Sequence, residues 1–84
     1  MTETVLLDVR RIAADVLRKT LDEVPPSGTR DTIPAWDSMA HVNLVLALEQ
    51  HFDVQFKPEE MLEMLSIELT AMLVEEKLTE RGSP

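Results

Sequence analysis

Trp36-Asp37-Ser38-Met39 and the run that follows it, AHVNLVLALEQHF (residues 40–52), decide the fold of this chain. A proline-bearing loop precedes the stretch, and neither Pro nor Gly interrupts the run, so we expect a helix from about Ser38 to His51. Its apolar residues cover roughly 220° of a helical wheel, which is wider than a single core-facing stripe requires. One edge of this arc carries Leu44, Leu48 and Phe52, and the other carries Met39, Val42 and Leu46.

The second edge of the arc has two interpretations. The helix is central and buried on both sides, or Met39, Val42 and Leu46 remain exposed for partner enzymes. In a helical bundle of this size both can hold in part.

The segment before this helix predicts one earlier helix and a long loop. Apolar residues recur at helical spacing from Val5 onward, which indicates a helix from about Thr4 to Thr20. Two prolines and a glycine prevent its continuation, so residues 22–36 form a loop. A connection this long needs apolar anchors, and those we expect to turn inward are Val24, Ile33 and Trp36.

The segment after the central helix predicts a connector and two more helices. Pro58 suits the first turn of a short helix, where its missing N–H is not needed, and the apolar residues around that helix are Met61, Leu62, Met64 and Leu65. Ser66 is placed to cap a last helix, which packs through the stripe Ile67, Ala71, Val74 and Leu78. We expect residues 53–57 to be an extended connector and residues 81–84 a loose tail.

The length, composition and net charge of the chain restrict the class of protein that it can be. Its 84 residues predict a single domain, 1–84, with a core from about residue 4 to residue 80. The absence of cysteine fits a cytoplasmic location, and no apolar run approaches the roughly 18 residues of a membrane span. The net charge of −8 disfavours nucleic acid and favours encounter with basic patches on other proteins. We expect a monomer.

Ser38 is the candidate for covalent chemistry. A serine at the start of a helix has its hydroxyl beside unpaired backbone N–H groups, which would stabilise the negative charge of a phosphodiester. Asp37 is placed to meet a modifying enzyme, through a basic residue or a divalent ion that the enzyme brings. From physics alone, the plainer interpretation is that Asp37 or Ser38 only caps the helix.

The pattern resembles the acyl and peptidyl carrier protein family. Asp37-Ser38-Met39 corresponds to the family's Asp-Ser-Leu, the apolar helix ends at Leu48-Glu49 and Phe52, and VQFKPEE (54–60) continues the likeness. The resemblance runs from about Val5 to Leu78. It implies an all-α four-helix bundle, with three longer helices, a short third helix and a long loop between the first two.

The same resemblance implies the function. Ser38 would carry a covalent phosphopantetheine arm, added by a phosphopantetheinyl transferase, and the arm would hold an acyl or aminoacyl group as a thioester. Partners would be the transferase, a loading enzyme and downstream transferases or synthases. The protein would be a carrier, not an enzyme.

The chain departs from fatty-acid-type carriers on its central helix. Those carriers usually have carboxylates two and five residues after the serine, whereas this chain has Ala40 and Asn43. Its acidic residues lie later in the chain, after the central helix, and we expect partners to contact Glu59 and Glu63 there. We expect the same partners to contact Met39, Val42 and Leu46. We therefore favour a specialised polyketide, nonribosomal peptide or related pathway. The alternatives are a fatty-acid-synthesis carrier and an unmodified acidic helical adaptor.

His41 lies one helical turn after Ser38 and raises the question of a Ser-His-Asp hydrolase. That site also needs an oriented acid and an oxyanion hole, and no Gly-rich loop or strand-turn-helix elbow is present. We expect His41 to edge the site of the prosthetic arm or to touch a partner. The two histidines and scattered carboxylates predict no metal site.

Overall fold

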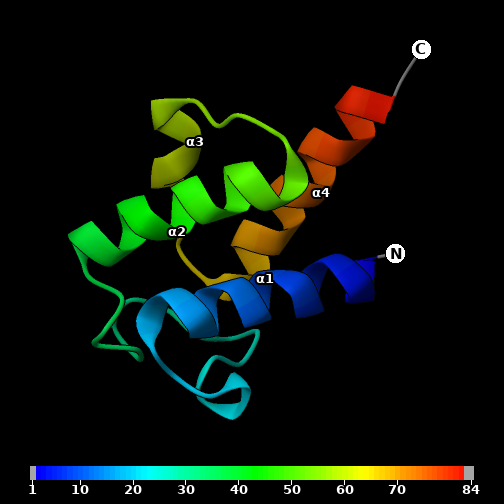
Figure 1. Cartoon of the computed structure of the whole chain (residues 1–84). Coiled ribbons are helices and arrows are strands. Elements are labelled where there is room, and N and C mark those ends of the chain that lie inside the picture. Colours follow the sequence, from blue (N-terminus) through cyan, green and yellow to red (C-terminus); the bar gives the residue numbers. More distant parts are fainter. Residues whose placement is uncertain (1, 83–84) are drawn as a thin grey trace.

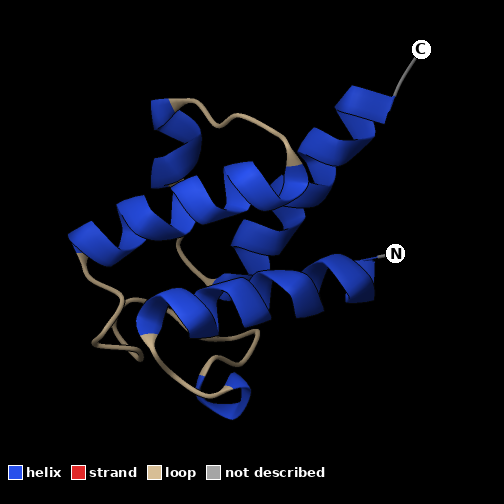
Figure 2. Cartoon of the chain, viewed as in Figure 1, coloured by secondary structure: helices blue, strands red, loops and turns tan. Residues whose placement is uncertain are grey.

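The computed structural model describes residues 2–82, and within them the chain is all-helical. It forms α1 (Thr2–Leu17), a 3-10 turn η1 (Leu21–Glu23), α2 (Ser38–Phe52), α3 (Pro58–Leu62) and α4 (Ile67–Gly82). α1 and α2 run in opposite directions, α4 crosses both, and the short α3 lies beside α2 (Figures 1 and 2). α1 packs against both α2 and α4. The predicted four-helix bundle with a long first loop is therefore confirmed.

The first helix ends earlier than its apolar pattern predicts. Arg18 adopts a left-handed backbone conformation, with φ 57°, and the N–H of Lys19 donates to the carbonyl of Ala14 over 2.8 Å. A left-handed residue followed by a backbone bond that reaches back five residues, instead of the usual four, terminates a helix. The expected end at Thr20 was therefore wrong by three residues, and the next residues form η1, which apolar spacing did not predict.

The long loop between α1 and α2 is hydrogen-bonded to the first and last helices, α1 and α4. From α1, the guanidinium of Arg10 donates to the carbonyls of Val24 and Leu21, over 2.7 and 3.0 Å. At its other side, the loop carbonyls of Gly28 and Pro26 accept from the first N–H groups of α4, both over 2.9 Å. The loop thus supplies partners for helix N–H groups that have none within the helix.

The core confirms the predicted anchors. Val24, Ile33 and Trp36 of the loop are buried, Trp36 to 1% exposure. They pack in one cluster with residues of every longer helix, among them Val9, Ala13, Leu17, Leu44, Leu48, Ile67, Ala71 and Val74. Burying this apolar surface is the main favourable term that holds the helices together.

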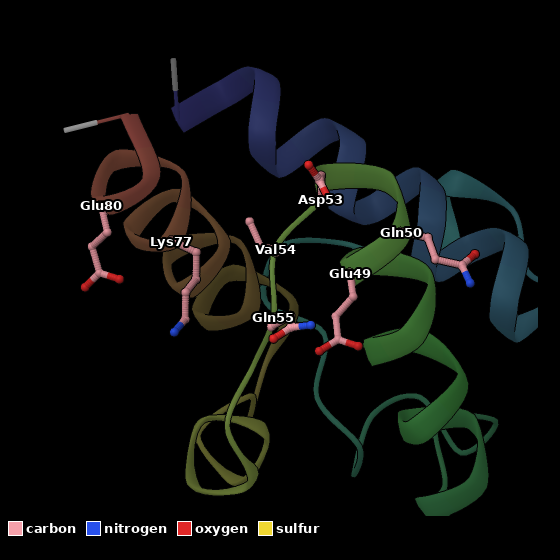
Figure 3. Close-up of a pocket in the computed structure, with 7 residues that line it drawn as sticks. All are labelled: Glu49, Gln50, Asp53, Val54, Gln55, Lys77 and Glu80. Atoms are coloured by element: carbon pink, nitrogen blue, oxygen red, sulfur yellow. The ribbon is translucent and has the colours of Figure 1, made fainter. Parts of the chain in front are cut away.

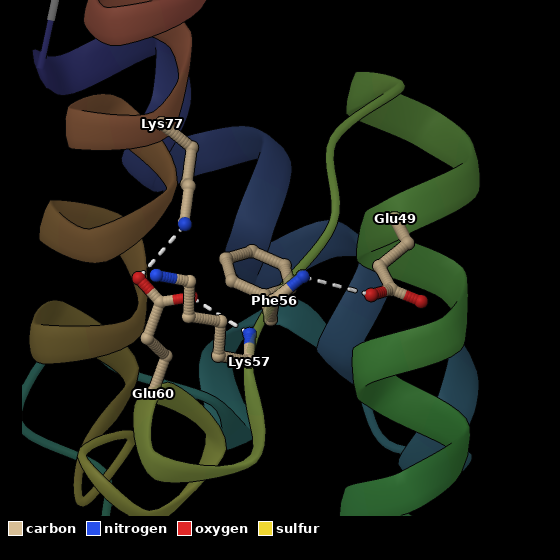
Figure 4. A network of polar contacts seen from close by, with 5 residues as sticks. All are labelled: Glu49, Phe56, Lys57, Glu60 and Lys77. Atoms are coloured by element: carbon tan, nitrogen blue, oxygen red, sulfur yellow. Dashed lines mark hydrogen bonds and ion pairs between the residues drawn. The ribbon is translucent and has the colours of Figure 1, made fainter.

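A polar network joins the connector after α2 to α3 and α4 (Figure 4). Glu49 accepts from the N–H of Phe56 over 2.9 Å, and Glu60 accepts from the N–H of Lys57 over 2.7 Å. The second oxygen of Glu60 pairs with Lys77 of α4 at 2.8 Å. The network closes the end of the bundle with backbone and side-chain partners. The connector has no regular secondary structure; Asp53 at its start is left-handed, with φ 56°, and Lys57 at its end is extended.

The last two helices begin where the sequence places them. Pro58 is the first residue of α3, and Ser66 caps α4 by accepting from the N–H of Leu69 over 3.1 Å. α4 continues through Arg81 and Gly82, where we expected a loose tail, and the remainder of that segment, residues 83–84, lies outside the described residues. None of the helices described has the length and apolar character needed to cross a membrane.

Candidate functional site

Ser38 is the first residue of α2, and its side chain is exposed. The helix is capped by Asp37, whose Oδ1 accepts from the N–H of Ala40 over 2.8 Å. Of the two cap candidates in the sequence, the structure therefore selects Asp37. The Ser38 hydroxyl is not used as the cap and faces solvent at the start of the helix.

Arg30 also lies at the Ser38 hydroxyl, although the sequence pattern did not predict it. Its Nη2 donates to the Ser38 hydroxyl oxygen over 3.1 Å, and its Nε donates to the carbonyl of Trp36 over 3.3 Å. The contact joins residues eight positions apart. The one available signal was a single basic residue in the loop leading to Ser38, in a chain of net charge −8.

The loop that presents Arg30 is ordered by its own threonines. Thr29 and Thr32 exchange backbone and hydroxyl hydrogen bonds of 2.8 to 3.2 Å, and the N–H of Ile33 donates to the carbonyl of Thr29 over 2.8 Å. An isolated antiparallel bridge joins Thr29 to Ser66 ahead of α4. Arg30 thus extends from a turn that is fixed on both sides.

His41 is held inside the fold. Its Nδ1 accepts from the indole N–H of Trp36 over 3.1 Å, and its Nε2 lies 2.9 Å from the carbonyl oxygen of Met61 in α3. An indole N–H only donates and a carbonyl only accepts, so the contacts select the neutral ring with its proton on Nε2. Both ring nitrogens of His41, which we expected at the arm or at a partner, are therefore engaged within the chain.

The residues expected at a partner surface are mostly exposed. Met39, Val42 and Leu46 are 76%, 53% and 50% exposed, so the second edge of the α2 arc is not covered by other helices. Glu59 and Glu63 are exposed on α3 and at its end. Leu44 and Leu48, on the opposite edge, are fully buried.

Comparison with solved structures gives the fold a known relative. The chain is similar to the holo acyl carrier protein from Geobacter metallireducens, determined by NMR in solution, with a TM-score of 0.82 and 27% sequence identity. The match covers 92% of this chain and 88% of that chain.

The chain therefore has the fold of an acyl carrier protein and is similar to one in sequence. No family model and no curated protein sequence matches it. The likeness extends over nearly the whole chain. This likeness indicates a carrier protein and not an enzyme.

A groove in this carrier protein lies at the opposite end of α2 from Ser38 (Figure 3). It has a volume of about 750 Å³ and is lined by Glu49, Gln50, Asp53, Val54, Gln55, Lys77 and Glu80. Glu49 is eleven positions beyond Ser38 on α2, which corresponds to roughly 16 Å along the helix axis. The groove is therefore separate from the serine.

The arrangement around Ser38 does not support the Ser-His-Asp hydrolase considered from the sequence. The nitrogens of His41 face Trp36 and Met61, while the Ser38 hydroxyl oxygen accepts from Arg30. A serine hydrolase requires a histidine bonded to the nucleophile. Among residues 4–80, whose side chains the structure describes, no three His, Asp or Glu residues are grouped so that they could hold a metal ion.

Proposed function

We propose that this carrier protein holds acyl or aminoacyl intermediates as thioesters on a phosphopantetheine arm attached to Ser38. The single observation that carries the proposal is the exposed Ser38 hydroxyl at the start of α2, beside a cap that Asp37 already supplies. The structural relative is a holo carrier protein. The terminal thiol of the arm would supply the thioester chemistry that this cysteine-free chain lacks.

The residues around Ser38 fit a phosphodiester. A phosphodiester carries one negative charge, and the start of α2 places the positive end of a 15-residue helix there. The Arg30 guanidinium adds a full positive charge within hydrogen-bond distance of the serine oxygen. An exposed hydroxyl also gives a transferase room to approach.

Attachment requires one displacement at phosphorus. The Ser38 oxygen forms a bond to the coenzyme A phosphorus that bears pantetheine, and the anhydride bond between the two phosphates breaks. Adenosine 3′,5′-bisphosphate leaves, and the serine proton passes to a base of the transferase. Asp37, exposed one residue before the nucleophile, is the residue we propose to contact the transferase or its divalent ion.

The surface for partner enzymes would combine the exposed apolar edge of α2 with the acidic residues of α3. The bond between His41 and the Met61 carbonyl holds α3 beside the first turns of α2. Met39, Val42 and Leu46 would make the apolar contacts, and Glu59 and Glu63 would steer basic partners. Glu60 does not belong to this set, because Lys77 and the N–H of Lys57 occupy its carboxylate.

A specialised pathway is the finer part of the proposal. It is supported by Ala40 and Asn43, which leave the start of α2 without the carboxylates usual in fatty-acid carriers. Loading assays test it: we expect an amino-acid-activating or polyketide-type loading enzyme to charge the holo protein better than a fatty-acid-type malonyl transferase does. The reverse order would support the fatty-acid alternative.

The attachment itself is tested by intact mass after incubation with coenzyme A and a broad-specificity phosphopantetheinyl transferase. We expect the mass gain of one phosphopantetheine, lost in Ser38→Ala and kept in Ser27→Ala, which removes another exposed serine. A folded protein without any gain would contradict the proposal and favour the unmodified adaptor.

A further inference from the structure

Arg30 is fixed at two points, and one of them is the oxygen that would be modified. Its Nε bond to the Trp36 carbonyl is 3.3 Å, and its Nη2 bond to the Ser38 oxygen is 3.1 Å. Trp36 is 1% exposed, and its backbone N–H donates to the Ile33 carbonyl over 2.9 Å. The anchor of the guanidinium is therefore a part of the chain that the core holds in place.

The geometry points to Arg30 as the positioning residue for the phosphate of the arm. The inference rests on the function proposed above, and adds that one side chain of the loop, in addition to the start of the helix, holds the diester. Of the basic side chains described, Arg30 is the one with a hydrogen bond to Ser38.

The change in bonding on modification explains why a guanidinium suits this position. Before modification the Ser38 oxygen accepts a hydrogen bond. Afterwards it is an ester oxygen, and the negative charge lies on the two nonbridging oxygens of the same phosphorus. Arg30 has five N–H donors in a planar fork, so its Nη groups can donate to a nonbridging oxygen while Nε keeps its bond to the Trp36 carbonyl. A bond between the guanidinium and a charged oxygen is stronger than the bond to a neutral hydroxyl that it replaces.

The consequence is a coupling between the arm and the loop. In the holo protein the diester would tie the start of α2 to residues 30–36 by an ion pair, where without the arm Arg30 bonds to the neutral hydroxyl of Ser38. The base of the arm would be held on the loop side of the helix, beside the exposed Met39. Modification would therefore stabilise the fold as well as supply the thiol.

The test compares apo and holo forms of the parent with Arg30→Gln, Arg30→Lys and Arg11→Gln. Arg11 is exposed on α1 and lies beside Gln50 and His51, so its variant removes the same charge at the far end of α2. Intact mass first establishes loading, with prolonged incubation so that slower variants also load completely. Thermal unfolding and the ³¹P chemical shift of the diester are then measured at low salt and in 1 M salt.

We expect the arm to raise the Tm of the parent and of Arg11→Gln, and this holo-minus-apo gain to be smaller by roughly 4 °C in Arg30→Gln. The difference should shrink in 1 M salt, where charges are screened within about 3 Å. The ³¹P shift should change in Arg30→Gln and not in Arg11→Gln. Arg30→Lys keeps the charge but not the fork, so it should retain part of the gain.

The outcomes separate this inference from the proposed function. No mass gain in the parent overturns both. Loading of every variant with equal gains in Tm and an unchanged ³¹P shift overturns the role of Arg30 alone. Should Arg30→Gln not unfold cooperatively, Arg30→Lys decides: a gain and a ³¹P shift equal to those of the parent overturn the inference, and a reduced gain supports it.

Discussion

The indole N–H of Trp36 donates to Nδ1 of His41 over 3.1 Å, and this bond ties the end of the first loop to the second turn of α2. The two rings are tilted by 38°, with their centroids 5.9 Å apart. Because Nε2 of the same histidine bonds to the Met61 carbonyl, one side chain links the loop, α2 and α3. The segment that presents Ser38 is thereby connected to the helix that would face partners.

Replacing His41 tests how much this link stabilises the fold. His41→Ala leaves the buried indole N–H of Trp36 without its acceptor, and an unsatisfied buried donor costs about 1–3 kcal/mol. We expect urea unfolding to show a loss in that range. His51→Ala, at an exposed position of the same helix, should change the free energy of unfolding by less than about 0.5 kcal/mol. Equal losses would show that the Trp36 bond contributes nothing specific.

Gly28 is the position in the loop where a methyl group does not fit. A Cβ there would lie 2.6 Å from Cδ1 of Ile33 and 3.0 Å from the carbonyl oxygen of Pro25. We expect Gly28→Ala to lower the free energy of unfolding by about 1–3 kcal/mol, the usual cost of overpacking. Ser27→Ala is the neighbouring control.

A double-mutant cycle identifies the cause of that loss. Ile33→Val removes Cδ1, so Gly28→Ala should cost less in the Ile33→Val background than in the parent. An undiminished cost would assign the strain to the Pro25 carbonyl instead.

Arg10 and Arg11 form a matched pair for testing the attachment of the loop to α1. Arg10 donates to two backbone carbonyls, those of Leu21 and Val24, whereas Arg11 is exposed. Arg10→Met should lower the free energy of unfolding by about 2 kcal/mol, and Arg11→Met by less than about 0.5 kcal/mol. Chemical denaturation measures both, and similar values for the two variants would exclude a special role for the Arg10 bonds.

The pH dependence of stability should report on Glu60. The N–H of Lys57, and after it Lys77, hold the pKa of the Glu60 carboxyl below its ordinary value of 4.5. A group with a lowered pKa in the folded state stabilises the fold above its ordinary pKa, and this stabilisation is lost as the pH falls through the lowered value. Glu60 also raises the pKa of Lys77, which therefore stays charged throughout this range.

We accordingly expect Glu60→Gln to be less stable than the parent at pH 7, and the difference to disappear as the pH falls well below 4.5. Urea midpoints measured from pH 7 to pH 3 test this, with Glu59→Gln as the control from the same helix. A gap between parent and Glu60→Gln that stayed constant over the range would rule out the carboxylate as its source.

The helices could be predicted from the sequence because their signals are local. Uninterrupted apolar periodicity gave α2 and α4, and Pro58 marked the start of α3. The inward anchors of the loop could be predicted too, since Val24, Ile33 and Trp36 are its large apolar residues. The end of α1 was not predictable in this way, because the left-handed backbone of Arg18 has no glycine to signal it.

The contacts of Arg30 and His41 could not be read from the pattern. Arg30 reaches Ser38 through a turn whose shape depends on hydrogen bonds within residues 29–33. His41 lies one helical turn after Ser38, yet its ring bonds to Trp36 and to a carbonyl twenty residues away. Spacing along a helix indicates which residues share a face, but the partners of their polar atoms depend on the tertiary fold.

The charges of α3 give the most direct test of partner recognition. Glu63 is the C-cap of α3. A positive charge at a helix C-terminus does not oppose the helix dipole, so Glu63→Lys reverses the charge without weakening the helix. We expect Glu59→Lys or Glu63→Lys to lower the kcat/KM of a loading enzyme about three- to tenfold at low salt, through slower encounter with a basic partner surface. Asn43→Ala, on the neutral strip of α2, should change this kcat/KM by less than about twofold.

Added salt should reduce the effect of the charge reversals, because screening weakens steering between exposed charges. If Asn43→Ala and the two charge reversals had equal effects, or if salt left them unchanged, recognition through the acidic residues of α3 would be excluded.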